Sequence, residues 1–374
     1  MVHRIVVVGA GYSGLTAAQR VARQARDADV VLVNATDRFV ERVRLHQVAA
    51  GQDVGEHALA DVLRGGRVQL VVARVLAIDP DRRELQLDGS DPLPYDTLVH
   101  AVGSGPATGS VPGAAENAVP VAHLDGAREL RKRVADIASD GGTLTVVGGG
   151  LSGIETATEL AETHPALRVR LLTAAEPGAA LSTRAREHLR RVFDRLGVDV
   201  RSGATAAEVR PDGVVLAGGE TVASDLTAWT TGFSVPQLAA DAGIATDPSG
   251  RVRVDGTHRS VSHQDVYAVG DSALSRTPRG DVLRMSCATG LPTGQYVADA
   301  VAARLAGHEP RTLRFRYFLQ CISLGRSDGL IQLVDADDHP HPMVLTGRAA
   351  ARTKESVVRG ALWTTQHPGP YGLR

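Results

Sequence analysis

Short apolar runs, each followed by a stretch with helical spacing of its apolar residues, recur along this chain. Residues 4–8 (RIVVV) and 143–147 (TLTVV) have the pattern of buried strands. The stretches at 15–26 and 154–164 have the spacing of helices. Alternation of buried strands with helices predicts an α/β protein with parallel sheets.

The turn between strand and helix has the same glycine spacing in both places. It reads Gly9-Ala-Gly11-Tyr12-Ser13-Gly14 in the first copy and Gly148-Gly-Gly150-Leu151-Ser152-Gly153 in the second. The first glycine permits a tight turn, the second lets the backbone approach a pyrophosphate, and the third lets helix and strand pack closely. The helix start then offers N–H donors to the phosphates. Two matching copies predict two bound dinucleotides.

A second apolar run follows each copy, at 30–33 and 169–172. The residue expected to contact the adenosine ribose ends this run and is Asn34 in the first copy and Thr173 in the second, at the same offset from the first glycine. Neither is acidic, so no charge at these positions repels the 2′-phosphate of NADPH. The choice between NADH and NADPH stays open.

Two arginines, Arg184 and Arg186, follow the second copy and could attract such a phosphate. The pattern favours another interpretation, in which they lie on the solvated face of a helix. The core side of that helix would carry Leu189, Val192, Phe193 and Leu196.

Composition limits the partners. The 374 residues suffice for two to three domains. Lys and Arg number 41 against 42 Asp and Glu, so we expect neither nucleic acid nor an anionic membrane as a partner. No apolar run reaches a membrane-spanning length, and a strand begins by residue 4, so we expect a cytoplasmic protein without a signal peptide. The two cysteines, Cys287 and Cys321, indicate neither a disulfide framework nor a zinc site.

A third signature is the apolar run that ends in Gly270-Asp271. Together with the segments 94–104 (PYDTLVHAVGS) and 229–233 (WTTGF), it resembles the two-dinucleotide flavoproteins that include the pyridine nucleotide-disulfide oxidoreductases. The resemblance implies that the Gly9 copy binds FAD and the Gly148 copy binds NAD(P)H. It also implies that Asp271 holds the FAD ribitol.

The resemblance implies two Rossmann-like domains, the second inserted in the first, plus a small C-terminal α+β interface domain that covers the flavin and often dimerises. We expect an FAD-binding domain at 1–108 and 250–305, an NAD(P)H-binding domain at 109–249 and the interface domain at 306–374. In the last of these, strands are expected at 313–318 and 329–334 and a helix from about residue 349, while the closing FAD-domain helix is expected from about 292 to 305. The loop at 335–342 contains His339 and His341, but its prolines favour a polar loop over a metal site.

The segment 39–50 narrows the choice among branches of the family. The disulfide reductases carry a redox-active cysteine there, whereas this segment contains none, so a thiol relay is excluded at this place. Its run Arg42-Val-Arg44-Leu-His46-Gln47 resembles type II NADH dehydrogenases and the apoptosis-inducing-factor and ferroptosis-suppressor quinone reductases. On pattern alone, the alternation of Arg42, Arg44 and His46 with apolar residues favours a strand with one wet face.

Two residues are candidates for the catalytic groups. Glu155 follows the second fingerprint, and the resemblance implies that it reaches the nicotinamide near the flavin; it could also simply stabilise the first turn of its helix. Lys354 is similar to a lysine that approaches the flavin from the C-terminal domain, although most lysines are merely exposed. Further expected cofactor contacts are Tyr12, Ser13, Arg42, Arg44, Gln47, Val75, Gly103, Leu151, Ser152, Gly232, Gly270 and Ala288.

These features predict an FAD-dependent NAD(P)H oxidoreductase that passes electrons to a quinone-like or other small electrophilic acceptor. Two alternatives stay open: a redox-switched interaction protein similar to apoptosis-inducing factor, and a tailoring oxidoreductase of a biosynthetic pathway. The stretch 287–292 (CATGLP) lacks the glutamines that face the quinone in type II NADH dehydrogenases, and the chain ends in a Pro-Gly tail. Both observations argue against a membrane quinone, and the tail in place of amphipathic helices predicts no firm membrane anchor. A homodimer stays open.

Overall fold

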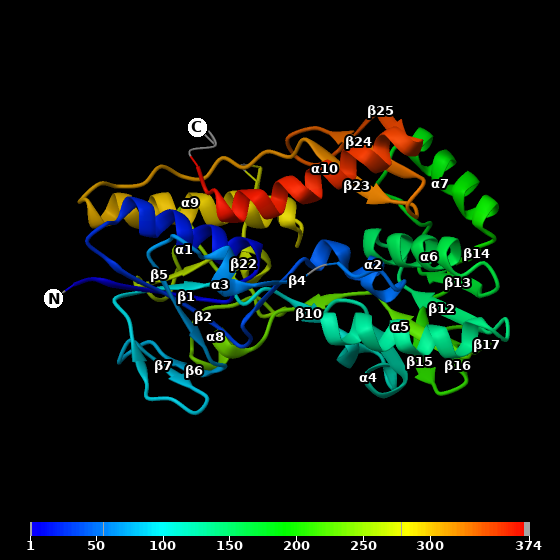
Figure 1. Ribbon diagram of the computed structural model, residues 1–374, viewed down its shortest axis with the longest axis horizontal. Helices are drawn as coiled ribbons and strands as arrows, with labels where there is room; N and C mark the ends of the chain where they lie inside the picture. Colours follow the sequence, from blue (N-terminus) through cyan, green and yellow to red (C-terminus); the bar gives the residue numbers. More distant parts are fainter. Residues whose placement is uncertain (1, 55, 278, 370–374) are drawn as a thin grey trace.

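A five-stranded parallel sheet forms one half of the molecule in the computed structural model, which describes residues 2–54, 56–277 and 279–369 (Figure 1). Its strand order is β21-β9-β1-β2-β5. The bounds are β1 (Arg4–Val8), β2 (Asp29–Asn34), β5 (Val68–Val72), β9 (Thr97–His100) and β21 (Val266–Ala268). The apolar run at 4–8 is therefore a strand, as predicted.

Both faces of this sheet are covered, which explains the uninterrupted apolar run of β1. Ile5 and Val7 pack with the helices α1 (Tyr12–Gln24) and α9 (Cys287–Leu305). Val6 and Val8 point to the opposite face, toward a small antiparallel sheet. That sheet consists of β6 (Val75–Asp79), β7 (Glu84–Leu87) and β8 (Leu93–Pro94).

A second five-stranded parallel sheet forms the other half, in the order β11-β18-β12-β13-β14. Its strands are β11 (Ala118–Pro120), β12 (Thr143–Val147), β13 (Arg168–Thr173), β14 (Asp199–Ser202) and β18 (Leu226–Trp229). The helices α5 (Leu124–Ala138), α6 (Leu151–Thr163) and α7 (Thr183–Leu196) and an antiparallel meander accompany it. The meander consists of β15 (Ala206–Arg210), β16 (Gly213–Leu216) and β17 (Thr221–Ala223). All these elements lie in sequence between β9 and β21 of the first sheet, while the domain limits given above stay predictions.

The C-terminal unit bridges the two halves (Figure 1). It consists of β23 (Leu319–Ser323), β24 (Gly329–Val334), β25 (Pro340–Thr346) and the long helix α10 (Gly347–Gln366). One end of α10 lies by β24 and β25, and the other end reaches α1, where Gln19 Nε2 donates to Thr365 O at 2.7 Å. This helix therefore connects the C-terminal sheet to α1.

The expected strand at 313–318 is wrong. This segment is extended, but its backbone forms isolated hydrogen bonds instead of a ladder, for example from Tyr317 N to Ala336 O at 3.1 Å. Its alternation arises because Phe315 and Tyr317 are buried with their rings 4.8 Å apart, packed with Leu283. The loop after β24 folds on Asp335, whose carboxylate accepts from the backbone of Asp337 and His339.

The strand with one wet face at Arg42–His46 is also wrong. The segment forms a 3-10 turn, η1 (Arg42–Arg44), followed by the short helix α2 (Leu45–Ala49). Arg44, His46 and Gln47 are buried. Arg44 and His46 find acidic partners on other segments, and Gln47 accepts from Arg44 within the same segment. The alternation of charged and apolar residues in this segment therefore does not indicate a solvent-exposed face.

Helix starts deviate by a few residues. Helix α9 begins at Cys287 and contains Pro292 in its second turn, whereas we expected the helix to begin near Pro292. Helix α7 buries Leu189, Val192 and Phe193, as predicted. Among the described residues, no helix is long and apolar enough to cross a membrane.

The remaining elements are short. They are β3 (Arg38–Val40), β4 (Glu56–Ala58), α3 (Leu59–Val62), β10 (Gly105–Pro106), η2 (Thr108–Ser110), α4 (Ala114–Asn117), β19 (Phe233–Ser234), α8 (Leu238–Asp241), β20 (Val252–Arg253), η3 (Gly270–Ser272) and β22 (Ala273–Leu274). The last residues of the Pro-Gly tail, 370–374, lie outside the described part of the chain.

Candidate functional site

The three glycines of the first turn have different surroundings. Gly9 has a φ of +105°, and a Cβ there would lie 2.3 Å from Ala101 O. A Cβ on Gly14 would lie 1.9 Å from Gly9 O. A Cβ on Gly11 would meet nothing within 4 Å. Gly9 and Gly14 are therefore required by the fold, whereas Gly11 leaves open space at a helix start, which fits a bound pyrophosphate.

The second turn repeats this arrangement. Gly148 has a φ of +123°, and a Cβ on Gly153 would lie 1.8 Å from Gly148 O. A Cβ on Gly150 would meet nothing within 4 Å. The fit to a phosphate group is therefore the same at both helix starts.

The starts of α1 and α9 meet around Ser13. A Cβ on Gly270 or on Gly290 would lie 2.2 or 2.5 Å from Ser13 Oγ, and one on Gly294 would lie 2.4 Å from Ser13 O. These close approaches bring the Gly270-Asp271 signature beside the first glycine turn. The resemblance implies that both the first glycine turn and Asp271 contact FAD, and these two segments do lie side by side.

Asp271 is held by two of the other predicted segments. Ser104 Oγ donates to Asp271 Oδ2 at 2.7 Å, and Arg42 Nη1 lies 3.5 Å from the same oxygen. The Arg42 guanidinium also lies 6.0 Å from the centre of the Phe233 ring. Gly103, with a φ of +72°, passes beside Arg42. The segment 94–104 thus contacts Asp271 directly, and the segment 229–233 lies beside Arg42, which pairs with Asp271.

The two expected ribose-contacting residues lie at equivalent places. Asn34 Oδ1 accepts from Ala10 N at 2.9 Å, and its Nδ2 donates to Thr36 O at 2.8 Å. Thr173 Oγ1 donates to Ala175 O at 2.8 Å. Each side chain fixes the loop after its strand, and its role toward a ribose stays a prediction.

A cavity of about 610 Å³ lies at the second glycine turn. Gly148, Gly150, Leu151, Thr173 and Gly232 line it from the second sheet. Arg284, in the segment before α9, and Gln320 and Asp338, in the C-terminal unit, also line this cavity. The volume is within the range usual for small-molecule sites.

Glu176 also lines this cavity and was missed by the sequence analysis. It pairs with Arg190 at 2.7 Å and with Arg186 at 3.8 Å, and the hydrogen bond from Arg190 lowers the pKa of Glu176. Thr173 itself carries no charge, as the sequence analysis states, but this acidic residue three positions later lines the same cavity. The signal was available, because Glu176 follows Thr173 in the same loop.

Glu155 and Lys354, the two candidates for catalysis, form an ion pair through Oε1 and Nζ. Their side chains are 12% and 11% exposed. Ser323 N donates to the same Oε1 at 3.0 Å, and Lys354 Nζ also donates to Cys321 O at 3.1 Å. Burial alone would raise the pKa of Glu155, but Lys354, His46 and Ser323 outweigh it, and the pKa is lowered. Glu155 is therefore a buried carboxylate held ionised.

Two further buried groups continue this cluster. His46 lies 3.9 Å from Glu155 Oε2 through Nδ1 and 3.9 Å from Glu159 Oε2 through Nε2. Burial lowers the pKa of His46 to about 4, and burial raises the pKa of Glu159. Gln52 Nε2 and Arg326 Nε bind Glu159 Oε1 at 2.6 and 2.9 Å. Among the described residues, His46 Nε2 and Glu159 Oε2 lack a hydrogen-bond partner.

Arg44, an expected cofactor contact, is engaged with carboxylates. It binds both oxygens of Glu355 at 2.9 and 3.0 Å, and Glu41 at 3.2 Å. Burial would lower the pKa of Arg44, but these acids outweigh it and raise the pKa. Gln47 accepts from Arg44 at 3.2 Å. Arg44 thus ties η1 to α10, and contact of Arg44 or Gln47 with a cofactor stays a prediction.

The other expected contacts are dispersed. Tyr12 packs edge-on against Phe39 with ring centres 5.0 Å apart, and burial raises the pKa of its hydroxyl. Ser152 and Ala288 are exposed in the first turns of α6 and α9. Val75 begins β6 and packs with the core on the far face of the first sheet. Val75 is therefore not brought to the Glu155 cluster.

Comparison with known proteins gives consistent matches. A family model described as pyridine nucleotide-disulphide oxidoreductase matches residues 3–297. The chain is similar to an NADH dehydrogenase-like protein of Mycobacterium tuberculosis, with 32% identity over 375 residues, covering 95% of this chain and 92% of that protein. It is also similar to the type II NADH:quinone oxidoreductase Ndh of the same organism, with 31% identity over 365 residues and coverage of 84% and 76%.

Among solved structures, NDH2 from Plasmodium falciparum in complex with NADH matches with a TM-score of 0.83. Its sequence identity is 13%, and the match covers 99% of each chain. At this identity the likeness concerns the fold alone. The predicted α/β fold class with two dinucleotide-binding units is confirmed.

Proposed function

The chain belongs to the pyridine nucleotide-disulphide oxidoreductase family, and from this premise we propose that it reduces a quinone-type acceptor at the expense of NADH or NADPH. FAD is the cofactor of this family and a nicotinamide nucleotide its co-substrate, as the sequence analysis predicted. The names of the relatives also confirm the expected branch of the family, the type II NADH dehydrogenases.

In the overall reaction, NAD(P)H, one proton and a quinone give NAD(P)⁺ and a hydroquinone. The nicotinamide loses a hydride, and the quinone gains two electrons and two protons. FAD supplies the two-electron carrier between the two substrates, because the redox chemistry belongs to the cofactors. The protein has to bind both dinucleotides, orient them and exclude water.

Residues of the first unit would hold FAD. The N–H groups at the start of α1 and the open space at Gly11 suit its pyrophosphate, and Asp271 offers a carboxylate beside that turn. The equivalent groups at Gly150 would hold the nicotinamide nucleotide in the cavity of about 610 Å³.

The Glu155–Lys354 pair carries the proposal most directly, because it joins the second dinucleotide turn to the C-terminal helix. Its ammonium and carboxylate are buried and fixed by Ser323 N and Cys321 O. A fixed ion pair can orient a polar ring edge and hold a proton donor at Lys354 Nζ for the reduced acceptor. The quinone acceptor itself is supported by the names of the relatives, and the missing glutamines at 287–292 leave its identity open.

The test is an anaerobic stopped-flow experiment on the purified flavin-loaded protein. NADH and NADPH are mixed with it separately, and flavin absorbance reports reduction. A quinone or air is added in a second mixing step. Rapid bleaching followed by rapid reoxidation by a quinone supports the proposal. A flavin that neither nucleotide bleaches, or a reduced complex that quinones leave unchanged for minutes, contradicts it.

A further inference from the structure

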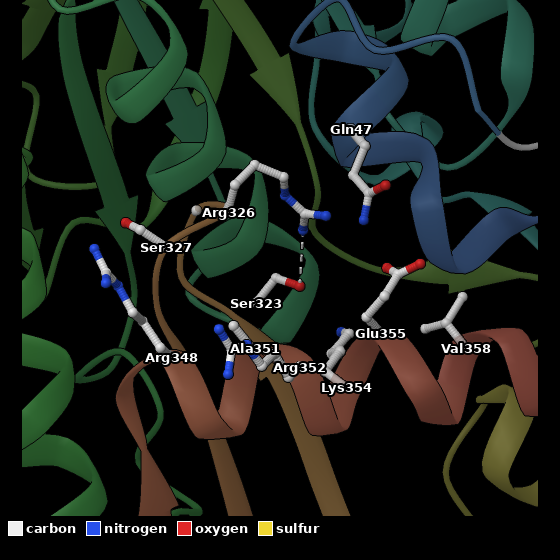
Figure 2. A pocket seen from close by; sticks show the side chains of 11 residues that line it. Gln47, Ser323, Arg326, Ser327, Arg348, Ala351, Arg352, Lys354, Glu355 and Val358 are labelled. Atoms are coloured by element: carbon white, nitrogen blue, oxygen red, sulfur yellow. Dashed lines mark hydrogen bonds between the residues drawn. The ribbon is translucent and has the colours of Figure 1, made fainter.

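A second cavity of about 370 Å³ lies beside Lys354 and is shown in Figure 2. Helix α10, the loop between β23 and β24, and Gln47 of α2 form its walls. It shares no lining residue with the nucleotide cavity at Gly148. We call it the basic pocket, because Arg326, Arg348, Arg352 and Lys354 line it.

Most charges of the basic pocket are compensated. Lys354 pairs with Glu155, and Arg326 pairs with Glu159 at 2.9 Å. Glu355, the acid in the lining, is neutralised by Arg44 and by Arg359 at 2.8 Å. Arg348 and Arg352 differ, because within the described residues neither guanidinium has a carboxylate or hydrogen-bond partner. Two positive charges are therefore uncompensated at this cavity.

The positions of these two arginines are unfavourable for the helix itself. They lie four residues apart on α10, where like charges repel each other. Arg348 is also the second residue of α10, where the helix dipole disfavours a cation. Local stability gives no reason for this placement, whereas a bound anion would reverse both penalties.

The basic pocket also adjoins the proposed reaction site. Lys354 and Ser323 line it, and both donate to Glu155 Oε1. Gln47, an expected flavin neighbour, faces α10 across the cavity in Figure 2. A molecule anchored on Arg348 and Arg352 would therefore extend toward Lys354.

We propose that the basic pocket binds an anionic electron acceptor, a quinone bearing a carboxylate or sulfonate group that Arg348 and Arg352 hold while its ring lies toward Lys354. This inference rests on the proposed function. It names the acceptor class, since guanidinium groups recognise such oxyanions through paired hydrogen bonds. The quinone takes two electrons from the reduced flavin and two protons, one originating as the hydride of NAD(P)H and one from solvent.

Calorimetric titration of the oxidised holoenzyme tests the binding without any turnover. The ligands are anthraquinone-2-sulfonate and its neutral counterpart 2-(hydroxymethyl)anthraquinone. The variants are R348Q/R352Q and, as a control with the same loss of charge at exposed sites elsewhere, R64Q/R82Q. The Kd of the sulfonate is expected to rise about tenfold in R348Q/R352Q, as for loss of charge-assisted hydrogen bonds at a partly exposed site. The control variant and the neutral ligand should show changes below about twofold.

Reoxidation kinetics of the same proteins link binding to electron transfer. With flavin reduced by dithionite, the apparent affinity for the sulfonate should fall in R348Q/R352Q by the same factor, and added salt should weaken it in the wild type. Equal sulfonate affinity in wild type and R348Q/R352Q overturns the inference. Because dithionite replaces the nucleotide, this result is distinguishable from failure of NADH or NADPH to reduce the flavin, which concerns the proposed function alone.

Discussion

Lys354 Nζ donates to Glu155 Oε1 although the two residues are 199 positions apart in the chain. The bond connects the helix after the second glycine turn to the last helix of the protein. The sequence predicted both residues as candidate catalytic groups, but separately and not as a pair. Two residues expected near the redox centre thus stabilise each other.

Removing one partner of this pair should leave the other buried and without its counter-charge. K354Q leaves the Glu155 carboxylate buried without its cation, which typically costs roughly 3 to 5 kcal/mol, and E155Q leaves a buried ammonium. In E155Q/K354Q no charge remains, so the loss in free energy of unfolding should be smaller than the sum of the two single losses. Urea unfolding of the holoenzyme, followed by far-ultraviolet circular dichroism, measures this. Additive losses would show that the pair contributes no coupling.

The glycines of each turn should separate into two classes. Gly11 and Gly150 have φ values near −75°, which alanine adopts freely, and open space at the Cβ position. G11A should therefore fold but lose flavin, and G150A should keep flavin while its KM for NADH rises roughly tenfold or more. Flavin content after purification and steady-state kinetics give these values.

The matched controls are G14A and G153A, in which the new Cβ would overlap the carbonyl oxygen of Gly9 or Gly148. These variants should lose stability before any question of ligand affinity arises. Comparable unfolding midpoints for G11A and G14A would contradict the assignment of one glycine to the phosphate and the other to packing.

Glu176 should set a preference for NADH. Its carboxylate lines the nucleotide cavity and neutralises Arg186 and Arg190, so that the 2′-phosphate of NADPH meets a negative charge. In E176Q both arginines become available, and kcat/KM for NADPH should rise about tenfold, or roughly 1.4 kcal/mol, with little change for NADH. E187Q serves as the control, because Glu187 is exposed and lies on α7, the helix that carries Arg186 and Arg190. Unchanged NADPH kinetics in E176Q would show that the ribose lies elsewhere.

His100 should contribute to loss of stability in acid. It is 0% exposed in β9, neither ring nitrogen has a partner among the described residues, and burial lowers its pKa to about 4. The unfolded chain binds a proton from about pH 6.5 downward, so stability falls between pH 6.5 and 4. In H100L this decrease should be smaller by about 3 kcal/mol.

Urea unfolding at several pH values between 7 and 4 measures the effect of His100. The exposed H308Q variant should retain the wild-type pH dependence. A parallel dependence in H100L and wild type would mean that the pKa of His100 is the same in the folded and the unfolded protein.

Sequence patterns predicted the structure correctly where a single short segment determines it. The runs at 4–8, 143–147 and 329–334 are strands with the expected bounds, because uninterrupted apolar residues bounded by turn residues have few alternatives to a buried strand. The glycine spacing was equally informative, because Gly9 and Gly148 adopt positive φ values that other residues rarely adopt.

Patterns failed where distant partners determine the environment. Arg44 alternates with apolar neighbours as on an exposed strand, yet its guanidinium is buried because Glu355 reaches it from the last helix. A buried charge needs a partner, and local sequence does not reveal which distant residue supplies it.

The pairing of β9 with β21 determines the order in which the two parallel sheets can form during synthesis on the ribosome. The second sheet is complete once Trp229 has been synthesised, whereas the first sheet, although begun at Arg4, still lacks Val266–Ala268 at that time. Domains fold largely as units during synthesis. The second sheet can therefore form first, and the first sheet is complete only after Val266–Ala268 have emerged.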